Sequence, residues 1–380
     1  MNKLLYVAPV PINFKHLDGV PKKILCQAEA LQNDFDVDII SYNKSNVFLY
    51  SVQEKNIKEL CSAKSKLDVL KTARLIVNNN QYNFAYIRYP KSDMFFLNML
   101  RAFKHRKMKV VVEIPTYPYD MEGFETIKGK LINILDRLFR EKISKYIDRI
   151  VTYSDDEEIF NIPTINTING IDFEKSDFDV NSIDNYQNII ALIAVSAMYR
   201  VHGYERLIRG LNDYYKDGGK RNIILKLIGL GDECSKYEEL VKKYKLENHV
   251  IFYGAKFGNE LTELYKENAM GINSLAIHRQ GLKEESTLKT KEYAAKGLPV
   301  LSSSYVDAFS KVGNKKFVLR IPADETNVNV KELIKFIDEL YSKKDIAEIR
   351  NGIREDGKKT CDIHITMKPI IEFLKESNTN

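Results

Sequence analysis

Residues 273–300 read NSLAIHRQGLKEESTLKTKEYAAKGLPV, and this stretch decides how the rest of the chain is interpreted. Two carboxylates, Glu284 and Glu292, flank a loop that runs into a helix, which Gly297 and Pro299 then end. Free N–H groups at the helix start and the cations before it form a seat for phosphate. A carboxylate inside the helix can accept hydrogen bonds from ribose hydroxyls. The pattern predicts a nucleotide site, and a solvated amphipathic surface helix is the alternative.

The segment from Glu284 to Glu292, followed by EYAAKGLPV, resembles the E-x7-E motif of retaining glycosyltransferases of the GT-B fold, specifically the large GT4 family. Glu292, Gly297 and Pro299 fall in register with that family's pattern EGFGLPxxEAxAxGxPV. The middle departs from it, because EESTLKTK replaces EGFGLPxx and both glycines are absent. This variant is more similar to a bacterial subgroup that makes surface polysaccharides. The resemblance implies catalytic roles for Glu284, beside the donor sugar, and for Glu292, on the ribose hydroxyls.

Length and composition fit an enzyme with more than one domain. The chain has 380 residues, of which 44% are hydrophobic and 29% charged, as is typical of globular proteins with large buried cores. The net charge of +6 is modest, so nucleic-acid binding is not inferred. The four cysteines form no C-x-x-C pair, which favours a reducing compartment over a zinc site or a disulfide framework. Because no signal peptide and no apolar run of roughly 20 residues is recognisable, we expect a cytoplasmic protein.

Short apolar strands alternate with helical segments in both halves of the chain, which is typical of parallel sheets covered by helices on both faces. TINTINGID at 164–172 resembles the NGVD segment that closes the first domain in GT4 enzymes, and the polar segment 174–187 is the expected linker. We therefore expect an α/β protein of GT-B type with two Rossmann-like doubly wound domains facing a central cleft. The expected domains are an acceptor domain at 1–178, with a crossover helix at 365–380, and a donor domain at 179–364.

The turn after the first strand of the second half, SAMYRVHGYERL from residue 196, is the next donor-site candidate. GT4 enzymes read G-R-L-x-x-x-K-G here, and that Arg and Lys hold the donor diphosphate. Ala197 and His202 stand in those places, so the usual pair of cations is absent. Arg200, His202 and Arg279 are the expected replacements, because a guanidinium can grip phosphate oxygens with two hydrogen bonds. For Arg200, a solvated turn cation is the alternative.

Two further turns carry donor-site candidates. Gly229-x-Gly231 matches the GxG that lies near the nucleotide in GT4 enzymes, although alone it mainly indicates a tight turn after a strand. Lys256 and Phe257 stand where such enzymes hold the base, and an ordinary core position is the alternative for Phe257. The full expected donor set is Gly19, Arg200, His202, Gly229, Gly231, Lys256, Phe257, Arg279, Lys283, Glu285, Ser286, Thr287, Leu288 and Glu292.

The acceptor-side candidates lie in the first half, at the ends of predicted strands. Gly19 follows the first strand, where related enzymes approach the donor phosphates or the acceptor, and a plain loop glycine is the alternative. YIRYP (86–90) and EIPTYPYD (113–120) are dense in aromatic residues and prolines at strand ends, which face the cleft in such sheets. GT4 enzymes often carry a His at the second of these places, which this chain lacks, so no catalytic base is assigned there. The expected acceptor-side residues are Arg88, Glu113, Thr116, Tyr117 and Asp120.

Helix 125–146 mixes apolar residues at helical spacing with six Lys and Arg side chains. Such a helix can lie on an anionic membrane surface or pack its apolar face on its own sheet, and both interpretations stay open. Because the chain has no HExxH, no Cys/His cluster and no G-x-S-x-G, metalloprotease, zinc and hydrolase chemistry are not indicated. We expect no metal and no cofactor, since the nucleotide sugar is a substrate.

The resulting hypothesis is a retaining glycosyltransferase that moves a sugar from a nucleotide-diphosphate donor, UDP rather than GDP, to a hydroxyl of a lipid-linked or growing bacterial surface glycan. Its expected partners are donor and acceptor, with a peripheral contact at the inner face of the cell membrane through helix 125–146. Two alternatives stay open. One is a nucleotide-sugar epimerase of the same fold, and the other is a catalytically inert glycosyltransferase-like partner subunit.

Overall fold

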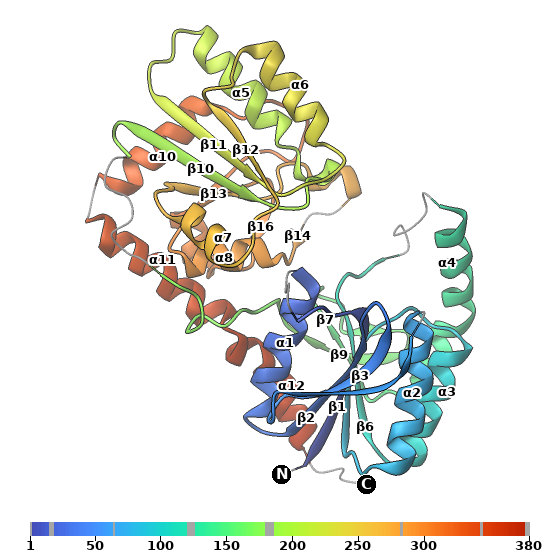
Figure 1. Cartoon of the computed structure of the whole chain (residues 1–380). Coiled ribbons are helices and arrows are strands. Elements are labelled where there is room, and N and C mark those ends of the chain that lie inside the picture. Colours follow the sequence, from blue (N-terminus) through green and yellow to red (C-terminus); the bar gives the residue numbers. More distant parts are fainter. Residues whose placement is uncertain are drawn as a thin grey trace. The chain divides into compact units, whose positions relative to one another are not determined.

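A computed structural model describes residues 2–14, 19–63, 65–119, 126–178, 186–281, 284–342 and 345–376, without the side chains of Glu284 and Glu285. It divides into two compact units, Met1–Ile168 with Thr366–Asn380, and Asn169–Ile365 (Figure 1). The division lies before the expected boundary at 178/179. The reason is that Ile171 forms a β-bridge with Asp362, and the carbonyl of buried Phe173 accepts a hydrogen bond from Arg354.

The first unit is built on a nine-stranded sheet in the order β4-β3-β2-β1-β5-β6-β7-β9-β8. Its central strands run parallel, as the alternation of strands and helices predicts. These are β1 (Lys3–Pro11), β2 (Asp36–Tyr42), β5 (Phe84–Arg88), β6 (Lys109–Ile114), β7 (Arg149–Thr152) and β9 (Ile162–Asn166). Both edges are antiparallel, with β3 (Asn46–Ser51) and β4 (Asn56–Ser62) as a hairpin and β8 (Glu158–Ile159) beside β9.

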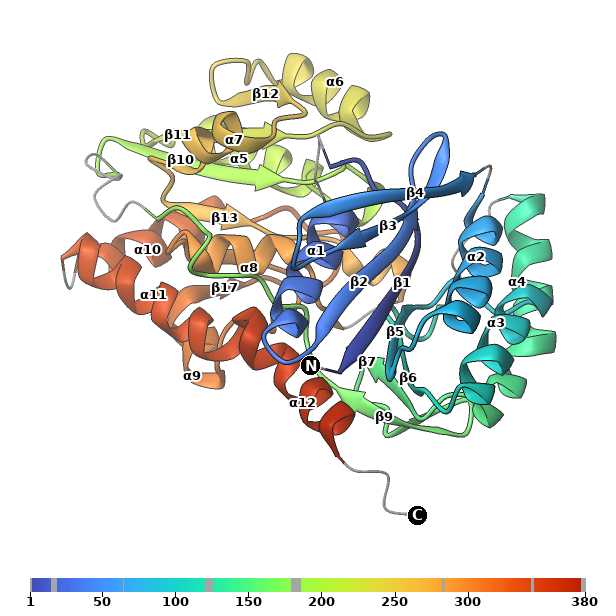
Figure 2. The same ribbon diagram turned by 60° about the horizontal axis from the view of Figure 1, so that its bottom comes forward.

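Helices cover both faces of this sheet. As Figures 1 and 2 show, α2 (Lys66–Asn79) and α3 (Met94–His105) lie on one face, while α1 (Gly19–Gln32) and the end of α12 (Ile363–Lys375) lie on the other. Ser65 and Asp68 form a capping box that starts α2, and the Asp93 side chain caps α3. Outside α3 lies α4 (Ile127–Phe139), which continues as the 3₁₀ turn η1 (Arg140–Lys145) (Figure 2).

The second unit contains a six-stranded, wholly parallel sheet in the order β12-β11-β10-β13-β15-β17. Its strands are β10 (Ile189–Val195), β11 (Asn222–Ile228), β12 (Val250–Gly254), β13 (Met270–Ile272), β15 (Val300–Ser302) and β17 (Val318–Arg320). The helices are α5 (Glu205–Lys216), α6 (Cys234–Tyr244), α7 (Gly258–Tyr265), α8 (Leu288–Ala295), α9 (Lys311–Phe317), α10 (Val330–Tyr341) and α11 (Ile346–Cys361). Both sheets confirm the predicted α/β class with two Rossmann-like units.

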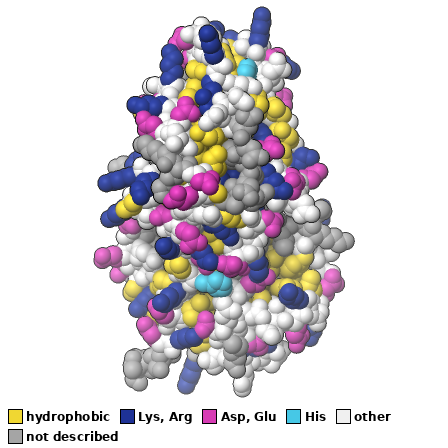
Figure 3. Space-filling view, turned by 90° about the vertical axis from the view of Figure 1, so that its left-hand side faces the viewer, with side chains coloured by type: hydrophobic (Ala, Val, Ile, Leu, Met, Phe, Trp, Pro, Cys, Tyr) yellow, Lys and Arg dark blue, Asp and Glu magenta, His cyan; other side chains and the backbone are white. Residues whose placement is uncertain are grey.

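The described surface is mixed in charge. On the face shown in Figure 3, Lys and Arg side chains lie among Asp and Glu side chains over most of the area. Within the described residues, no helix combines the length and apolar character that crossing a membrane requires.

Candidate functional site

The β10–α5 turn of the second unit is fastened to the loop after β13. The backbone N–H groups of Leu275 and Ala276 donate to the carbonyl oxygens of His202 (2.8 Å) and Val201 (3.1 Å). Gly203 makes this approach possible, because its φ is +61° and a Cβ there would lie 2.6 Å from the Ala276 Cβ. The predicted diphosphate turn and the segment that leads into the E-x7-E motif are therefore one structural piece.

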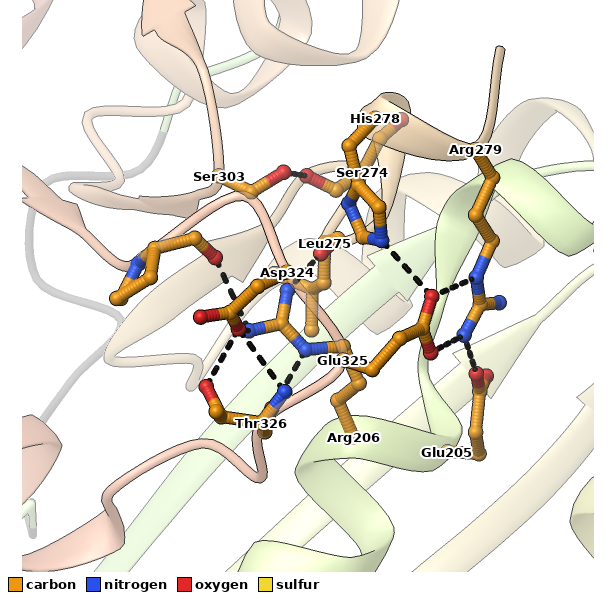
Figure 4. A network of polar contacts seen from close by, with 11 residues as sticks. Glu205, Arg206, Ser274, Leu275, His278, Arg279, Ser303, Asp324, Glu325 and Thr326 are labelled. Carbon is orange, nitrogen blue, oxygen red and sulfur yellow. Dashed lines mark hydrogen bonds and ion pairs between the residues drawn. The ribbon is translucent and has the colours of Figure 1, made fainter. Parts of the chain in front are cut away.

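Arg279, an expected phosphate ligand, already has four acceptor atoms. Its guanidinium donates to Glu325 through Nε (2.8 Å) and Nη2 and to Glu205 through Nη2 (2.5 Å), as Figure 4 shows. Its Nη1 donates to the Arg200 carbonyl at 2.8 Å. Hydrogen bonds from Arg279 and then from His278 lower the pKa of Glu325 to about 2. Arg279 therefore positions η3 (Ile277–Gln280), and its charge is balanced by two carboxylates. Sequence spacing could not reveal this, because Glu325 is distant along the chain.

A second arginine, Arg206, also binds the loop after β13. The sequence pattern did not indicate this role. The Arg206 side chain is fully buried and donates to the carbonyls of Thr326 (2.7 Å), Pro322 (3.0 Å) and Leu275 (Figure 4). It also pairs with Asp324 at 3.2 Å. A buried guanidinium with this many acceptors fixes the loop rigidly, since breaking it would leave several polar groups without partners.

His202 is a neutral, buried ring beside a lysine. Its Nδ1 accepts the Tyr199 N–H at 2.9 Å, so the proton of the neutral ring is on Nε2. Burial, and then the charge of Lys289, lower the pKa of His202 to about 2. Lys289 itself donates to the Ser274 hydroxyl at 3.0 Å. The place where GT4 enzymes carry a lysine thus holds a neutral N–H donor, and the positive charge comes from α8.

Among the described residues, the first turn of α8 has two features that favour anion binding: no side-chain cap and no acidic residue. Thr287 is the N-cap residue, yet its side chain makes no capping hydrogen bond to the described chain, and the first turn has no acidic residue. The Ser286 hydroxyl, in contrast, is fully used. It donates to Asp307 (2.5 Å) and accepts from the buried Lys291 (3.1 Å) and from the Asn169 N–H (3.0 Å). The Ser286 hydroxyl is therefore not available to a ligand, and among the described residues 286–288 the backbone N–H groups are the donors to consider.

The two carboxylates of the E-x7-E motif have different settings. Glu292 lies in the middle of α8, half-buried, and its Oε2 accepts a hydrogen bond from Tyr265 at 3.2 Å. The next residue, Tyr293, anchors the helix by donating to the Ile272 carbonyl at 3.1 Å. The backbone of Glu284 forms β14 (Glu284–Glu285), which pairs with β16 (Tyr305–Val306). The side chains of Glu284 and Glu285, and all of Lys283, lie outside the described residues.

Gly229 and Gly231 serve the packing of two turns. A Cβ on Gly229, whose φ is +127°, would lie 1.8 Å from the Ser196 carbonyl oxygen, and one on Gly231 would lie 2.4 Å from that of Met198. Between them, Leu230 is exposed. Further along the sheet, Phe257 is also exposed, which excludes the core alternative for this residue, and Lys256 pairs with Glu260 at 3.3 Å.

In the first unit, two acceptor-side candidates meet in a buried charged cluster at the strand ends. Glu113 on β6 is fully buried and lies 2.6 Å from Lys23 Nζ of α1 and 3.6 Å from Arg88 Nη1 of β5. Tyr153 also donates to Glu113. Burial alone would raise the pKa of Glu113, but Lys23 and Arg88 outweigh it and lower the pKa to about 2.

The other described first-unit candidates have different surroundings. Thr116 is exposed, while Tyr117 packs in an aromatic group with Tyr119 and Phe160. Gly19 begins α1 in an exposed, left-handed conformation with a φ of +43°. Asp120 lies outside the described residues. Within those residues, no group of three or more His, Cys, Asp or Glu side chains is arranged to hold a metal ion.

Comparison with protein families now identifies the second unit. Residues 174–360 match the family model for glycosyl transferases group 1. The chain is a glycosyltransferase. The matched region contains the α8 segment, the His202 turn and both glycines of the β11 turn, so this family domain carries all the donor-site candidates except Gly19.

Solved structures with the same fold span the whole glycosyltransferase. A glycosyltransferase from Rickettsia africae ESF-5 has a TM-score of 0.65 and 14% identity, covering 100% of this chain and 99% of its own. Anabaena Alr3699/HepE in complex with UDP has a TM-score of 0.65 at 13% identity, and sucrose-phosphate synthase from Thermosynechococcus elongatus has 0.67 at 14%; each match covers 98% of this chain and 99% of the other. These likenesses establish the GT-B fold. No curated protein matches the sequence significantly.

Proposed function

We propose that this glycosyltransferase uses a nucleoside-diphosphate sugar, with UDP as the nucleotide, and binds it on the second unit. The observation that carries the proposal is the arrangement at α8, where an uncapped first turn without acidic residues lies next to Lys289 and the neutral His202. Helix N–H groups, a cation and a neutral N–H donor match a diphosphate. The HepE structures, in complex with UDP and with UDP-glucose, support UDP as the first nucleotide to test.

The chemistry follows from these groups. The bond between the anomeric carbon and the diphosphate breaks, and negative charge develops on the leaving oxygen as positive charge develops on the sugar. The α8 amides and Lys289 are fixed before the reaction begins and stabilise the leaving charge electrostatically, without a bound metal. Glu292 binds the ribose hydroxyls and Glu284 lies beside the donor sugar. We assign a retaining GT4-type reaction, in which the acceptor attacks on the face from which the diphosphate departs.

For the acceptor, we propose a hydroxyl of a lipid-linked or growing bacterial surface glycan, and a cytoplasmic site of action. The support is the resemblance of the HR-x-GL-x-E-x-S-x-LKT-x-EY segment to the polysaccharide subgroup. Arg88, which is partly exposed, lies at the end of β5, at the edge of the sheet where Rossmann-like folds bind ligands, and it pairs with the buried Glu113.

Glu292→Gln tests the donor site most directly. If Glu292 accepts hydrogen bonds from ribose hydroxyls, calorimetry should show UDP and uridine binding weakened by roughly tenfold to a hundredfold, since a charge-assisted hydrogen bond contributes about 1.5–3 kcal/mol. Glu284→Gln should lower turnover and change UDP affinity little. Unchanged UDP affinity in Glu292→Gln would remove Glu292 from the site. Release of UDP that does not depend on an acceptor would contradict transfer to a glycan.

A further inference from the structure

Helix α4 of the first unit exposes its apolar face to solvent, whereas an ordinary surface helix buries that face. Its large apolar side chains are exposed, with exposed fractions of 81% for Ile127, 57% for Leu131, 55% for Ile134, 48% for Leu135 and 59% for Leu138. At 100° per residue these five side chains span an arc of about 100°, the width of stripe that a helix normally turns toward a protein core. We call these five residues the α4 stripe.

The opposite side of α4 is polar and buried. Asp136, which is 1% exposed, accepts hydrogen bonds from the Ser92 N–H (2.6 Å) and from the hydroxyls of Tyr89 (2.6 Å) and Tyr119 (2.7 Å). Asn133, also buried, accepts from Lys91. Rotating the helix about its axis to bury the stripe would remove the hydrogen-bond partners of the buried Asp136 carboxylate. It would also place leucine side chains against the polar groups that now bind Asp136, so this rotation is unfavourable. The exposure of the stripe is therefore built into the fold.

Cations border the stripe on both sides. On the same helical projection, Lys128 follows one edge of the arc, and Lys130 and Arg137 follow the other; all three are exposed. In η1, Lys142 and Lys145 outnumber one exposed carboxylate, Glu141, so the positive charge continues along this turn. The acidic residue of α4 itself, Asp136, is on the buried side. A solvent-facing apolar arc edged by lysine and arginine is complementary to a surface that is apolar inside and negative at its boundary.

We propose that the α4 stripe inserts into the interface of an anionic lipid bilayer, with the flanking cations at the level of the phosphates. The apolar part of helix 125–146 that packs on its own sheet is its end, where Ile143 of η1 is buried in the core, whereas the α4 stripe stays exposed. The inference is independent of the donor and acceptor assignments, because it rests on the exposure and charge of α4 alone. A second copy of the chain covering the stripe is the rival occupant, but a pair of like stripes would bring their bordering cations together.

Flotation of the full-length protein with vesicles tests the proposal. We expect binding to phosphatidylcholine vesicles that contain phosphatidylglycerol, much weaker binding to phosphatidylcholine alone, and loss of binding at high salt. Leu131→Ser/Leu138→Ser should weaken binding at least about tenfold, because two side chains that would leave water no longer do so. Lys128→Gln/Lys130→Gln should weaken it by about fivefold per lysine on the anionic vesicles.

The matched control is Leu75→Ser/Val312→Ser, which removes two equally exposed apolar side chains, one on α2 of the first unit and one on α9 of the second. This control should bind vesicles like the wild type. All variants change exposed residues, so thermal unfolding should stay at the wild-type temperature. Wild-type protein that ignores anionic vesicles, or a leucine double variant that binds them as before, would overturn the proposal. So would a dimer in sedimentation that Leu131→Ser/Leu138→Ser converts to monomer without any effect on vesicles.

Discussion

Replacing Lys289 with Gln tests the phosphate part of the proposed donor site separately from the nucleoside part. Lys289 supplies the positive charge near the open start of α8, and its Nζ lies 3.0 Å from the Ser274 hydroxyl. A charge-assisted hydrogen bond to a phosphate oxygen contributes about 1.5–3 kcal/mol. UDP affinity in Lys289→Gln should therefore fall by roughly tenfold to a hundredfold. Uridine, which has no phosphate, should bind as it does to the wild type, whereas Glu292→Gln should weaken both.

Isothermal titration calorimetry with UDP, UMP and uridine provides the comparison. The control is Lys236→Gln, which removes an exposed lysine of α6 that pairs with Glu233. A second readout is the titration of His202 by NMR, because the charge of Lys289 helps to lower its pKa and that pKa should rise in the variant. The reasoning fails if UDP affinity stays within about twofold of the wild type, or if uridine loses as much affinity as UDP.

Two further predictions concern the scaffold that carries the candidate sites. Glu113→Gln should lower the free energy of unfolding by roughly 3–5 kcal/mol, because the buried Lys23 and the partly buried Arg88 lose their shared carboxylate. Since the folded pKa of Glu113 is about 2, below its usual 4.5, the wild type should lose this stability as the pH falls from about 4.5 toward 2, and urea titrations of the variant should lack that slope. Gly229→Ala should cost roughly 2 kcal/mol or more, because its Cβ would meet the Ser196 carbonyl. Gly258→Ala, with a φ of +54° but open space, should cost only about 1 kcal/mol, and equal losses would contradict the steric account.

The alternation of apolar strands and helices was enough to predict the two parallel sheets, because burial on both faces selects such strands. It did not reveal the β3–β4 hairpin. Most of β4 is exposed, so its sequence NIKELCS carries no buried face, and the turn contains Lys55 in the left-handed conformation rather than a glycine. Edge strands that bury little leave little trace in a hydrophobicity pattern.

The candidate site divides in the same physical way. Local features, such as the end of α8 at Gly297 and the tight turn at Gly229, follow from short-range conformational rules and were predictable. The partners of Arg279 were not, because Glu205 and Glu325 come close only after the chain has folded. The burial of Asp136 was likewise not predictable, because Tyr89 comes close to it only in the folded chain. Helical periodicity shows that α4 has an apolar face but not which way that face points.

The turn Gly229-Leu230-Gly231 has a consequence for engineering the proposed nucleotide site. Both glycines are fixed by contact with carbonyl oxygens of the neighbouring turn, so the backbone there tolerates no side chain at either position. Leu230 projects into solvent between them, at 63% exposure. Residue 230 is therefore the position of this turn at which side chains can be exchanged. A saturation library at residue 230 would sample new surfaces at the carboxyl end of β11 on an unchanged backbone, whereas substitutions at either glycine would destabilise the protein.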